Sequence, residues 1–573
     1  MPSQNHHRID TIHCTYRIHW VHHTVRILSL MLLVVCLCLA FSSSASAHVK
    51  LPAIFSDHMV LQQKAKVPVW GWADPGEKIM VTTGWSKMVY SAQADASGKW
   101  KVMVQTPAAG GPFIIDVAGT NSIHLQDILI GEVWLCSGQS HMVISLKSSE
   151  HAEKEIAQAN FPAIRYFSVT RQYANRKFDD SPGAVWETTT SATAPSFSAV
   201  AYFFAKKLHQ KLNVPIGLVY SAWGGTPAEA WTPEPVLKAD TILARYIDRW
   251  RFIQENVGKD SVNYHIALAN WEQAHHSQDS AASKKTDDRY TETATARTSD
   301  PGNKTVNPGA RSAKKPEEPQ TLYYYERPWR EPGVLLAGMI DPIIPFAIKG
   351  VLWYQGESNV NYADEYFRLL SAMIHSWRAR WGTEAHPLDF SFYVVQISAF
   401  GYSSLDNAAR VRDAEYQVMK KVPNTGTAVT VDLGNMKNIH FTRKEEVGDR
   451  LARIALARDY GYNSLVYKGP EAQKANGENG KVLITFEPST AGLSVNGLVR
   501  GFELGYRAPS GDSLLFVPAE ARIEGNKIRV WNDQVKNPVE VRYAWLLVAE
   551  ANLFNTAGLP AYPFRMKITG KKQ

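Results

Sequence analysis

The segment "GEVWLCSGQSHM" (residues 131–142) decides how the rest of the chain is interpreted. Its apolar run "GEVWL" leads into a turn of small and polar residues that ends at Ser140, where a helix can begin. A Ser at such a junction either caps the helix or is a nucleophile presented at the end of a strand. For an isolated G-x-S, the cap is favoured by roughly ten to one. The segment also lacks the second Gly of the G-x-S-x-G motif, because Met142 stands there.

Short apolar runs recur along the chain and indicate its fold class. They are apolar at consecutive positions, as in strands buried on both faces of a sheet. The runs are "DILIGEVWLC" (127–136), "AIRYFSV" (163–169), "IGLVYSAWG" (216–224), "GVLWYQG" (350–356), "FYVVQIS" (392–398) and "AVTVDLG" (428–434). Helical patterns lie between several of them, for example at 198–213 and from Tyr366 to Gly382. This alternation predicts an α/β domain with a mostly parallel sheet, whose active residues gather at the carboxyl ends of strands.

The two ends of the chain carry a different pattern from its middle. Residues 48–127 and 466–573 consist of short β runs separated by turn sequences, and each region is expected to form a β-sandwich. The α/β domain is then expected at 128–465. It contains an insert at about 233–330, which begins with a helical pattern and continues through a polar stretch, 277–319, that cannot bury a core. A chain of 573 residues is too long for one core, in agreement with this division.

The N-terminal segment, residues 1–47, is typical of an export signal. Arg residues precede the apolar run at 27–41, and "SSSASA" (42–47) offers a cleavage site of small residues. We therefore expect the protein to be exported, to the periplasm or the extracellular space. The apolar run is short for a membrane span and no later segment is long enough, so no stable span is expected after cleavage.

Charge and cysteine content exclude some classes of protein. The formal net charge is +8, and removal of residues 1–47, with their three Arg and one Asp, leaves about +6. This charge is mild and no dense Lys/Arg run accompanies it, so nucleic-acid binding is not expected. Of the four Cys, only Cys136 lies outside the signal, so the mature chain can form no internal disulfide.

Chemically distinctive residues follow three further strands of the predicted sheet. In "SAWGGTPAEAW" (221–231), Gly224 and Gly225 either bring a backbone N–H close to a ligand or form a tight turn. In "WYQGESN" (353–359), an amide and a carboxylate either face a site or belong to a solvated loop. His440, six residues after the run at 428–434, is either a general base or an exposed loop residue. Taken together, a Ser, a Gly pair, a Gln and a His at separate strand ends favour one catalytic site.

These blocks resemble the sialate O-acetylesterase family of the Ser-Gly-Asn-His hydrolase superfamily. The resemblance extends through most of residues 48–568 outside the insert, and it includes "VKLPAIFSDHMVLQQ" (49–63), "VWGWADPGE" (69–77), "GEVWLCSGQSHM" (131–142), "GGTPAEAW" (224–231), "IKGVLWYQGESN" (348–359) and "NLFNTAGLPAYPFR" (552–565). It implies a three-layer, flavodoxin-like α/β hydrolase domain with a parallel sheet, flanked by the two β-sandwiches.

The resemblance also implies a chemistry, namely removal of acetyl esters from O-acetylated sugars without a metal or cofactor. Ser140 would attack the acetyl carbonyl and form an acetyl-enzyme, and His440 would carry the proton. The oxyanion would be held by backbone N–H groups of Ser140 and of Gly224 or Gly225, and by the side-chain amide of Gln355. The residues implied to line the substrate pocket are Gln139, His141, Trp223 and Glu357.

The sequence departs from the family at two points near these residues. His141 stands where relatives usually have Asn. The acid that would orient the catalytic His is absent, because Lys437 occupies the position three residues before His440 and Asn438 the position two residues before it. In a Ser protease, Asp→Asn at the equivalent member lowers turnover by ~10⁴. We expect a Ser–His dyad oriented by a backbone carbonyl, with Asn438 as the alternative orienting residue.

Other functions remain as alternatives. The substrate can be acetylated xylan or another plant polysaccharide in place of a sialic acid acetate. The missing acid also allows a catalytically weakened protein that binds glycans. A glycoside hydrolase with Glu357 and Asp432 as its carboxylate pair ranks lower, because it leaves Ser140 and His440 without roles.

Overall fold

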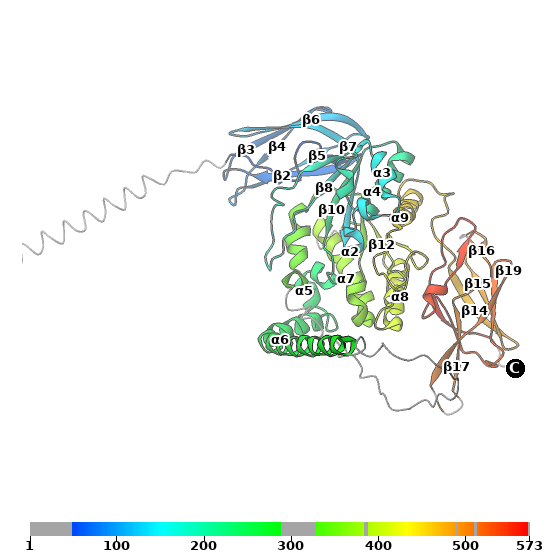
Figure 1. Ribbon diagram of the computed structural model, residues 1–573. Helices are drawn as coiled ribbons and strands as arrows, with labels where there is room; N and C mark the ends of the chain where they lie inside the picture. The colour runs from blue at the N-terminus through cyan, green and yellow to red at the C-terminus, as the bar shows by residue number, and fades with distance from the viewer. Residues whose placement is uncertain are drawn as a thin grey trace, which may run out of the picture.

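The structure is a computed structural model that describes residues 48–287, 327–382, 388–488, 491–508, 511 and 513–570 (Figure 1). The predicted export signal and residues 288–319 of the predicted polar stretch lie outside the described residues. Within the described part of the chain, no helix is both long and apolar enough to cross a bilayer. The same residues contain no group of His, Cys, Asp and Glu side chains suited to holding a metal ion.

A central sheet forms the middle of the molecule. Its strand order is β13-β12-β11-β7-β10-β8-β9, and all neighbours pair in parallel except β8 and β9, so the sheet is mixed. The strands are β7 (Ser122–Gly138), β8 (Phe161–Ser168), β9 (Trp186–Thr189), β10 (Ile216–Ala222), β11 (Gly350–Tyr354), β12 (Ser391–Val395) and β13 (Thr425–Ala428). Every residue of β10, β11 and β12 is buried, which confirms the prediction of strands covered on both faces.

Helices cover both faces of this sheet. On one face α4 (Ala199–Leu212) packs beside α9 (Lys444–Asp459), and on the other α7 (Ala363–Trp381) packs beside α8 (Leu405–Lys421). The alternation along β11 separates the two apolar cores, because Trp353 belongs to the α7 side and Tyr354 to the α4 side. The predicted helices at 198–213 and 366–382 are confirmed: Ser198 caps α4, and Gly382 ends α7.

The N-terminal β region is joined to the central sheet by a shared strand. Residues 122–130 of β7 pair with β6, and residues 132–138 pair with β10. The predicted domain boundary at 127/128 therefore falls inside a strand, with no linker. The change of pattern reflects burial on one face giving way to burial on both. The other strands are β1 (Val60–Gln62), β2 (Lys66–Trp72), β3 (Lys78–Thr83), β4 (Ser86–Gln93), β5 (Lys99–Gln105) and β6 (Gly110–Ala118).

Two predicted segments differ from the structure. The run at 428–434 shares only Ala428 with β13, because Val429 and Val431 leave the sheet and pack against Val548 and Tyr562 of the C-terminal region. The predicted insert begins with α5 (Glu234–Lys238) and α6 (Ala244–Asp287). The helix therefore continues through the first part of the polar stretch, since a polar composition does not prevent a helix.

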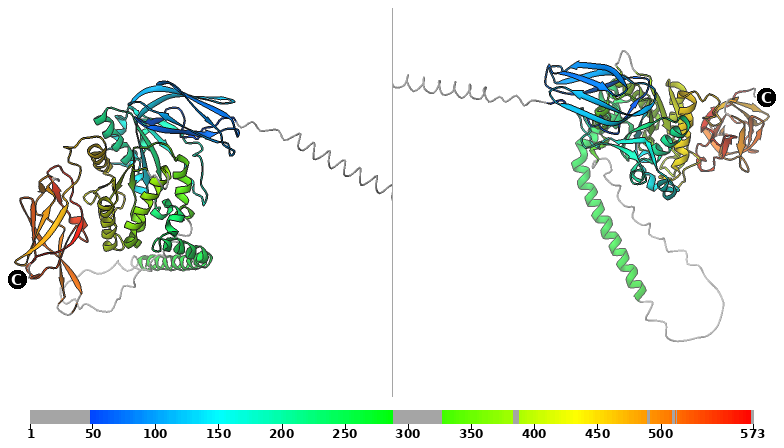
Figure 2. Two further views of the ribbon diagram at one scale, coloured as in Figure 1. Left: turned by 180° about the vertical axis from the view of Figure 1, so that it is seen from behind. Right: turned by 90° about the horizontal axis from the view of Figure 1, so that it is seen from above.

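The C-terminal region consists of antiparallel sheets that share one apolar core (Figure 2). The strand orders are β14-β15-β20-β19, β18-β17-β21-β23 and β16-β22. The region contacts the α/β part through Tyr562, which donates to the Thr427 carbonyl at 3.1 Å, and through Trp545, which donates to Asp406 at 2.8 Å. The strands are β14 (Ala472–Glu478), β15 (Lys481–Phe486), β16 (Leu493–Val495), β17 (Phe502–Arg507), β18 (Leu514–Pro518), β19 (Glu520–Glu524), β20 (Lys527–Trp531), β21 (Glu540–Tyr543), β22 (Leu553–Asn555) and β23 (Phe564–Lys567).

Candidate active site

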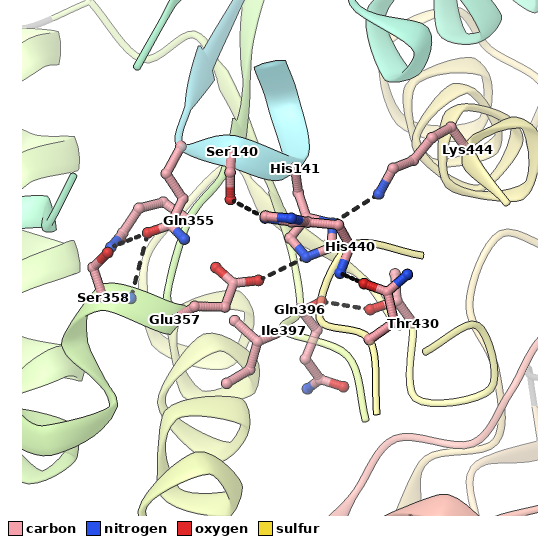
Figure 3. Close-up of polar contacts among 12 residues, drawn as sticks. Ser140, His141, Gln355, Glu357, Ser358, Gln396, Ile397, Thr430, His440 and Lys444 are labelled. Carbon is pink, nitrogen blue, oxygen red and sulfur yellow. Dashed lines mark hydrogen bonds and ion pairs between the residues drawn. The ribbon is translucent and has the colours of Figure 1, made fainter. Parts of the chain in front are cut away.

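Ser140 lies at the carboxyl end of β7, as the first residue of the short helix α2 (Ser140–Val143). The N-cap is Gln139, and its side chain makes no capping hydrogen bond. The Oγ atom of Ser140 instead lies 2.9 Å from Nε2 of His440 (Figure 3). Of the two interpretations of this Ser, the geometry therefore fits a nucleophile beside a base better than a helix cap.

Backbone contacts hold the turn that carries Ser140. The N–H of Gln139 donates to the Tyr354 carbonyl at 2.9 Å, and the N–H of Trp223 donates to the Gly138 carbonyl at 3.1 Å. Gly138 has a φ of +134°, and a Cβ there would lie 2.2 Å from the Tyr354 oxygen. Only Gly allows this approach of β7 and β11, so the position of Ser140 depends on it.

His440 comes from the loop between β13 and α9. The Asn435 side chain accepts the backbone N–H of Lys437 at 2.9 Å and that of Asn438 at 2.7 Å. The Asn438 side chain accepts the backbone N–H of His440 at 2.9 Å. The two Asn side chains thus shape the loop through turns of the Asx type.

The imidazole of His440 has no orienting acceptor among the described residues. Asn438 bonds the main chain of His440 and not its ring, and no described carbonyl or carboxylate accepts from Nδ1. The expectation of a backbone carbonyl at Nδ1 is therefore not met. The ring packs edge-on against His141 at a centroid distance of 5.4 Å. Burial and then the charge of Lys444 lower the pKa of His440, which favours the neutral base.

Backbone donors for an oxyanion lie beside Ser140. A Cβ on Gly224 would lie 3.6 Å from Cβ of Ser140, so the two residues are in contact across the ends of β7 and β10. Gly225 has a φ of +72°, which favours Gly. Within the described chain, no hydrogen bond uses the backbone N–H of Ser140, Gly224 or Gly225. These donors are available to a ligand.

Gln355 does not face the nucleophile. Its Nε2 lies 2.7 Å from the Asn359 side-chain oxygen, 3.2 Å from that of Gln139 and 3.2 Å from the Thr226 carbonyl. Its Oε1 accepts from the Tyr366 hydroxyl at 2.9 Å. Because an amide nitrogen has two hydrogens, these protein acceptors already occupy it. The structure thus differs from the expectation of an oxyanion donor, and Gln355 supports Gln139 from behind.

A cavity of about 540 Å³ opens in front of the Ser140–His440 pair. Of the predicted site residues it is lined by Gln139, Ser140, Gly224, Gly225, Glu357 and His440. Trp223 lies outside its wall and stacks on Trp329 at a centroid distance of 5.3 Å. Three further residues line the cavity and were not predicted from the sequence, namely Arg327, Arg330 and Tyr402. Both arginines lie at the end of the predicted insert, and no spacing in the sequence connects them with the motifs.

Three ionisable side chains are in contact, with Glu357 at the cavity wall and His141 and Lys444 behind it (Figure 3). Nζ of Lys444 donates to Nδ1 of His141 at 2.7 Å, and Nε2 of His141 lies 3.4 Å from Oε1 of Glu357. Burial lowers the pKa of Lys444 to about 7 and raises that of Glu357 to about 7. Burial, followed by the charges of Lys444 and His440, lowers the pKa of His141 well below its usual range. His141 is therefore neutral and lies behind the pocket.

The alternative carboxylate pair is not assembled. Asp432 forms a two-pronged ion pair with Arg450, with both distances at 2.7 Å, and it does not line the cavity. Glu357 is the acidic side chain among the described residues of the wall. The geometry thus gives a glycoside hydrolase with Glu357 and Asp432 no support.

Comparisons with known proteins find carbohydrate esterases. The family model for a carbohydrate esterase, sialic acid-specific acetylesterase, matches residues 333–457. The chain is 28% identical over 459 residues to the sialate O-acetylesterase of Homo sapiens, with 74% of each chain covered. It is 27% identical over 561 residues to that of Mus musculus, covering 91% of this chain and 94% of the mouse protein.

A solved structure extends the likeness to three dimensions. A carbohydrate acetylesterase from Xanthomonas citri is 31% identical to this chain and superposes with a TM-score of 0.70. The alignment covers 90% of this chain and 99% of the Xanthomonas chain. The likeness therefore includes the β-rich regions as well as the α/β part.

Proposed function

The chain belongs to the sialate O-acetylesterase family and is a carbohydrate acetylesterase, and on this premise we propose that it works as a serine esterase with Ser140 as nucleophile and His440 as base. The observation that carries the mechanism is the 2.9 Å contact between Oγ of Ser140 and Nε2 of His440 at the cavity. Neutral His440 accepts the Oγ proton as Oγ attacks the acetyl carbonyl.

The tetrahedral intermediate requires donors for its oxyanion. The backbone N–H groups of Ser140, Gly224 and Gly225 have no protein acceptor among the described residues, and Gly224 contacts Ser140, so the N–H of Ser140 and that of Gly224 or Gly225 can supply these donors. His440 then gives its proton to the sugar oxygen, which leaves as an alcohol. Water, activated by the same imidazole, attacks the acetyl-Ser140 ester, and acetate is released with the hydroxyl restored.

The dyad works without a carboxylate on Nδ1. The imidazolium formed during attack lacks a neighbouring negative charge, and Lys444 opposes it. We infer that turnover is slower than in a complete triad, where changing Asp to Asn lowers turnover by ~10⁴. The low pKa of His440 partly compensates, because the imidazole remains an unprotonated base in mildly acidic solution.

For the substrate we propose an acetylated sialic acid, with the 9-O-acetyl ester as the leading candidate. The curated relatives are sialate O-acetylesterases, and the cavity carries Arg327 and Arg330 as well as Ser140. Guanidinium groups suit the carboxylate of an acidic sugar. Acetylated xylan is neutral and would make no use of them. Acetate release from 9-O-acetylsialic acid and from acetylated xylo-oligosaccharides distinguishes these substrates, and a preference for xylan would overturn the sialate proposal.

We also propose that the protein is exported, on the basis of the signal pattern in residues 1–47. The mature chain would begin near His48. N-terminal sequencing of protein recovered from the periplasm or the medium tests this, and an uncleaved chain in the cytoplasm would contradict it.

The serine mechanism is tested by acetate release from p-nitrophenyl acetate by residues 48–573. We expect turnover by the wild type and a fall of about 10⁴-fold or more in both Ser140→Ala and His440→Ala. Activity that survives Ser140→Ala would contradict the mechanism. Equal inactivity of all three proteins would favour a glycan-binding protein that has lost its chemistry together with the acid.

A further inference from the structure

Three buried side chains behind the cavity come from different elements. His141 belongs to α2, Lys444 begins α9, and Glu357 lies in the turn after β11. The His141 and Lys444 residues are fully buried, and the Glu357 side chain is 5% exposed. Burying charges is costly unless they are paired, so this arrangement requires a reason.

The contacts determine the tautomer of His141. A Lys side chain only donates, so Nδ1 of His141 accepts from Nζ of Lys444 at 2.7 Å. Because the ring is neutral, its proton is on Nε2, which lies 3.4 Å from Oε1 of Glu357. The ring stacks on Tyr354 at a centroid distance of 4.8 Å, which fixes its plane. A neutral imidazole thus lies between a cation, to which it is hydrogen-bonded, and a carboxylate, which it approaches to 3.4 Å without a hydrogen bond.

Lys444 is placed as a cation. Its Nζ lies 3.8 Å from the centre of the Phe441 ring and 5.4 Å from that of Tyr354. Its charge lowers the pKa of Glu357 against the larger effect of burial. The other titratable groups that interact with Glu357 are His141, Tyr354, Tyr366, Tyr402 and Glu415. Burial raises the pKa of Glu415 well above its ordinary value, so Glu415 is protonated when Glu357 ionises, and Lys444 is the cation that favours the carboxylate form of Glu357.

Neither carboxylate oxygen of Glu357 has a hydrogen bond of good geometry among the described residues, although Nε2 of His141 lies 3.4 Å from Oε1 and, against the larger effect of burial, the backbone N–H groups of Glu357 and Gly356 lower the pKa of this carboxyl group. Glu357 lines the cavity that contains Ser140, and each of its two carboxylate oxygens has less than 1 Å² of exposed surface. Buried polar atoms are almost always satisfied, and a carboxylate can only accept. A donor supplied by the ligand would complete this site, and a sugar carries hydroxyl groups next to its acetyl ester.

We propose that Glu357 binds a hydroxyl group of the sugar beside the ester, and that His141 and Lys444 are positioning residues that keep Glu357 in place as a carboxylate. The inference rests on the proposed esterase function. The path from Lys444 to Glu357 runs through the imidazole of His141. It makes sugar recognition depend on Lys444, in addition to the effect of Lys444 on the pKa of His440.

The test compares two esters across a range of pH, using residues 48–573. 9-O-Acetylsialic acid has sugar hydroxyls, whereas p-nitrophenyl acetate has none. For Glu357→Gln we expect kcat/KM for the sugar ester to fall about 10- to 100-fold further than for p-nitrophenyl acetate, as for loss of a hydrogen bond to a charged group.

Lys444→Met separates positioning from structure. Without the cation the pKa of Glu357 rises, so the acid limb of kcat/KM for the sugar ester should move up by about one pH unit more than for p-nitrophenyl acetate. A shift common to both esters reports His440, whose pKa Lys444 also lowers. Raising the pH should restore sugar-ester turnover in Lys444→Met but not in Glu357→Gln. Lys437→Met, an exposed change in the loop that leads to α9, is the matched control.

The double variant Lys444→Met/Glu357→Gln completes a double-mutant cycle with the two single variants. If Lys444 acts through Glu357, the double variant loses no more sugar-ester selectivity than Glu357→Gln alone. The inference would be overturned if Glu357→Gln lowered kcat/KM equally for the two esters. It would also be overturned if Lys444→Met moved the acid limb of the pH profile equally for both. Full p-nitrophenyl acetate activity in Ser140→Ala would instead overturn the esterase mechanism, and this inference with it.

Discussion

The nucleophile side of the cavity is built from strand ends, whereas the base side is built from a loop. Ser140 follows β7, whose end is bonded to the ends of β10 and β11 through Trp223 and Tyr354. His440 lies in a loop whose residues 435–438 are exposed, and Asn435 and Asn438 hold that loop by bonding its backbone. One side is fixed by the sheet, and the other by local turns.

This difference indicates which part of the site tolerates amino-acid substitution. A strand end that is buried and hydrogen-bonded leaves little room for a new side chain. A loop stabilised by its own Asn side chains keeps its shape when an acid is replaced by an amide, because either group accepts a backbone N–H. The loss of the triad acid thus removes a charge without removing the loop.

Gly138→Ala disturbs the strand ends that hold Ser140 and should have the largest effect on turnover. The new Cβ would lie 2.2 Å from the Tyr354 oxygen at a φ of +134°, so β7 and β11 must separate. A displacement of about 1 Å at the nucleophile costs roughly 100-fold in turnover. We expect at least that loss for p-nitrophenyl acetate, together with a lower Tm by calorimetry. Gly258→Ala, where a Cβ meets nothing within 4 Å, is the control. Retained activity in Gly138→Ala would show that the strand side is not rigid.

Asn438→Asp tests whether the loop that carries His440 differs from a complete triad only by the missing negative charge. The Asp can keep the bond to the His440 N–H and place a negative charge beside the imidazole. We expect kcat for p-nitrophenyl acetate to rise about 10-fold, short of the ~10⁴ that separates Asp from Asn in a complete triad. Asn435→Asp makes the same change three residues earlier in the chain and is the matched control. Equal rates in wild type and Asn438→Asp would mean that the loop holds this carboxylate away from Nδ1.

The same contrast explains how much the sequence reveals. The sequence predicts that Ser140, Gly224 and His440 meet, and all three line one cavity. Ser140 and Gly224 meet because parallel strands carry their carboxyl-end residues to one edge, whereas His440 reaches them from the loop after β13. The direction of Gln355 was not predictable. Its amide turns toward Gln139 and Asn359, and these contacts depend on side chains from elsewhere in the fold.

Features that depend on contacts between distant segments were also not predictable from the sequence. From the sequence, Lys444 is indistinguishable from any charged residue at the start of a helix. Its contact with His141 depends on the tertiary fold. The apolar run at 428–434 looks like a strand, yet its second half is buried by the C-terminal region. Nor does a change of pattern near residue 128 reveal that β7 continues through it. In each case, burial by a distant segment decided the outcome.

The smallest expected effect is the position of the acid limb in the pH profile of the wild type. His440 must be neutral to accept the Ser140 proton, so activity falls as His440 becomes protonated. Burial is the larger cause of its lowered pKa and the Lys444 charge the smaller, so the limb for p-nitrophenyl acetate should lie below pH 6.5, the ordinary value for His. In Asn438→Asp the new charge favours the imidazolium, and the limb should move to higher pH. Profiles of kcat/KM between pH 4 and 9 measure both positions. An acid limb above pH 6.5 in the wild type would mean that the imidazole of His440 already has an anionic neighbour in solution. The loop would then not lack the negative charge that a complete triad has.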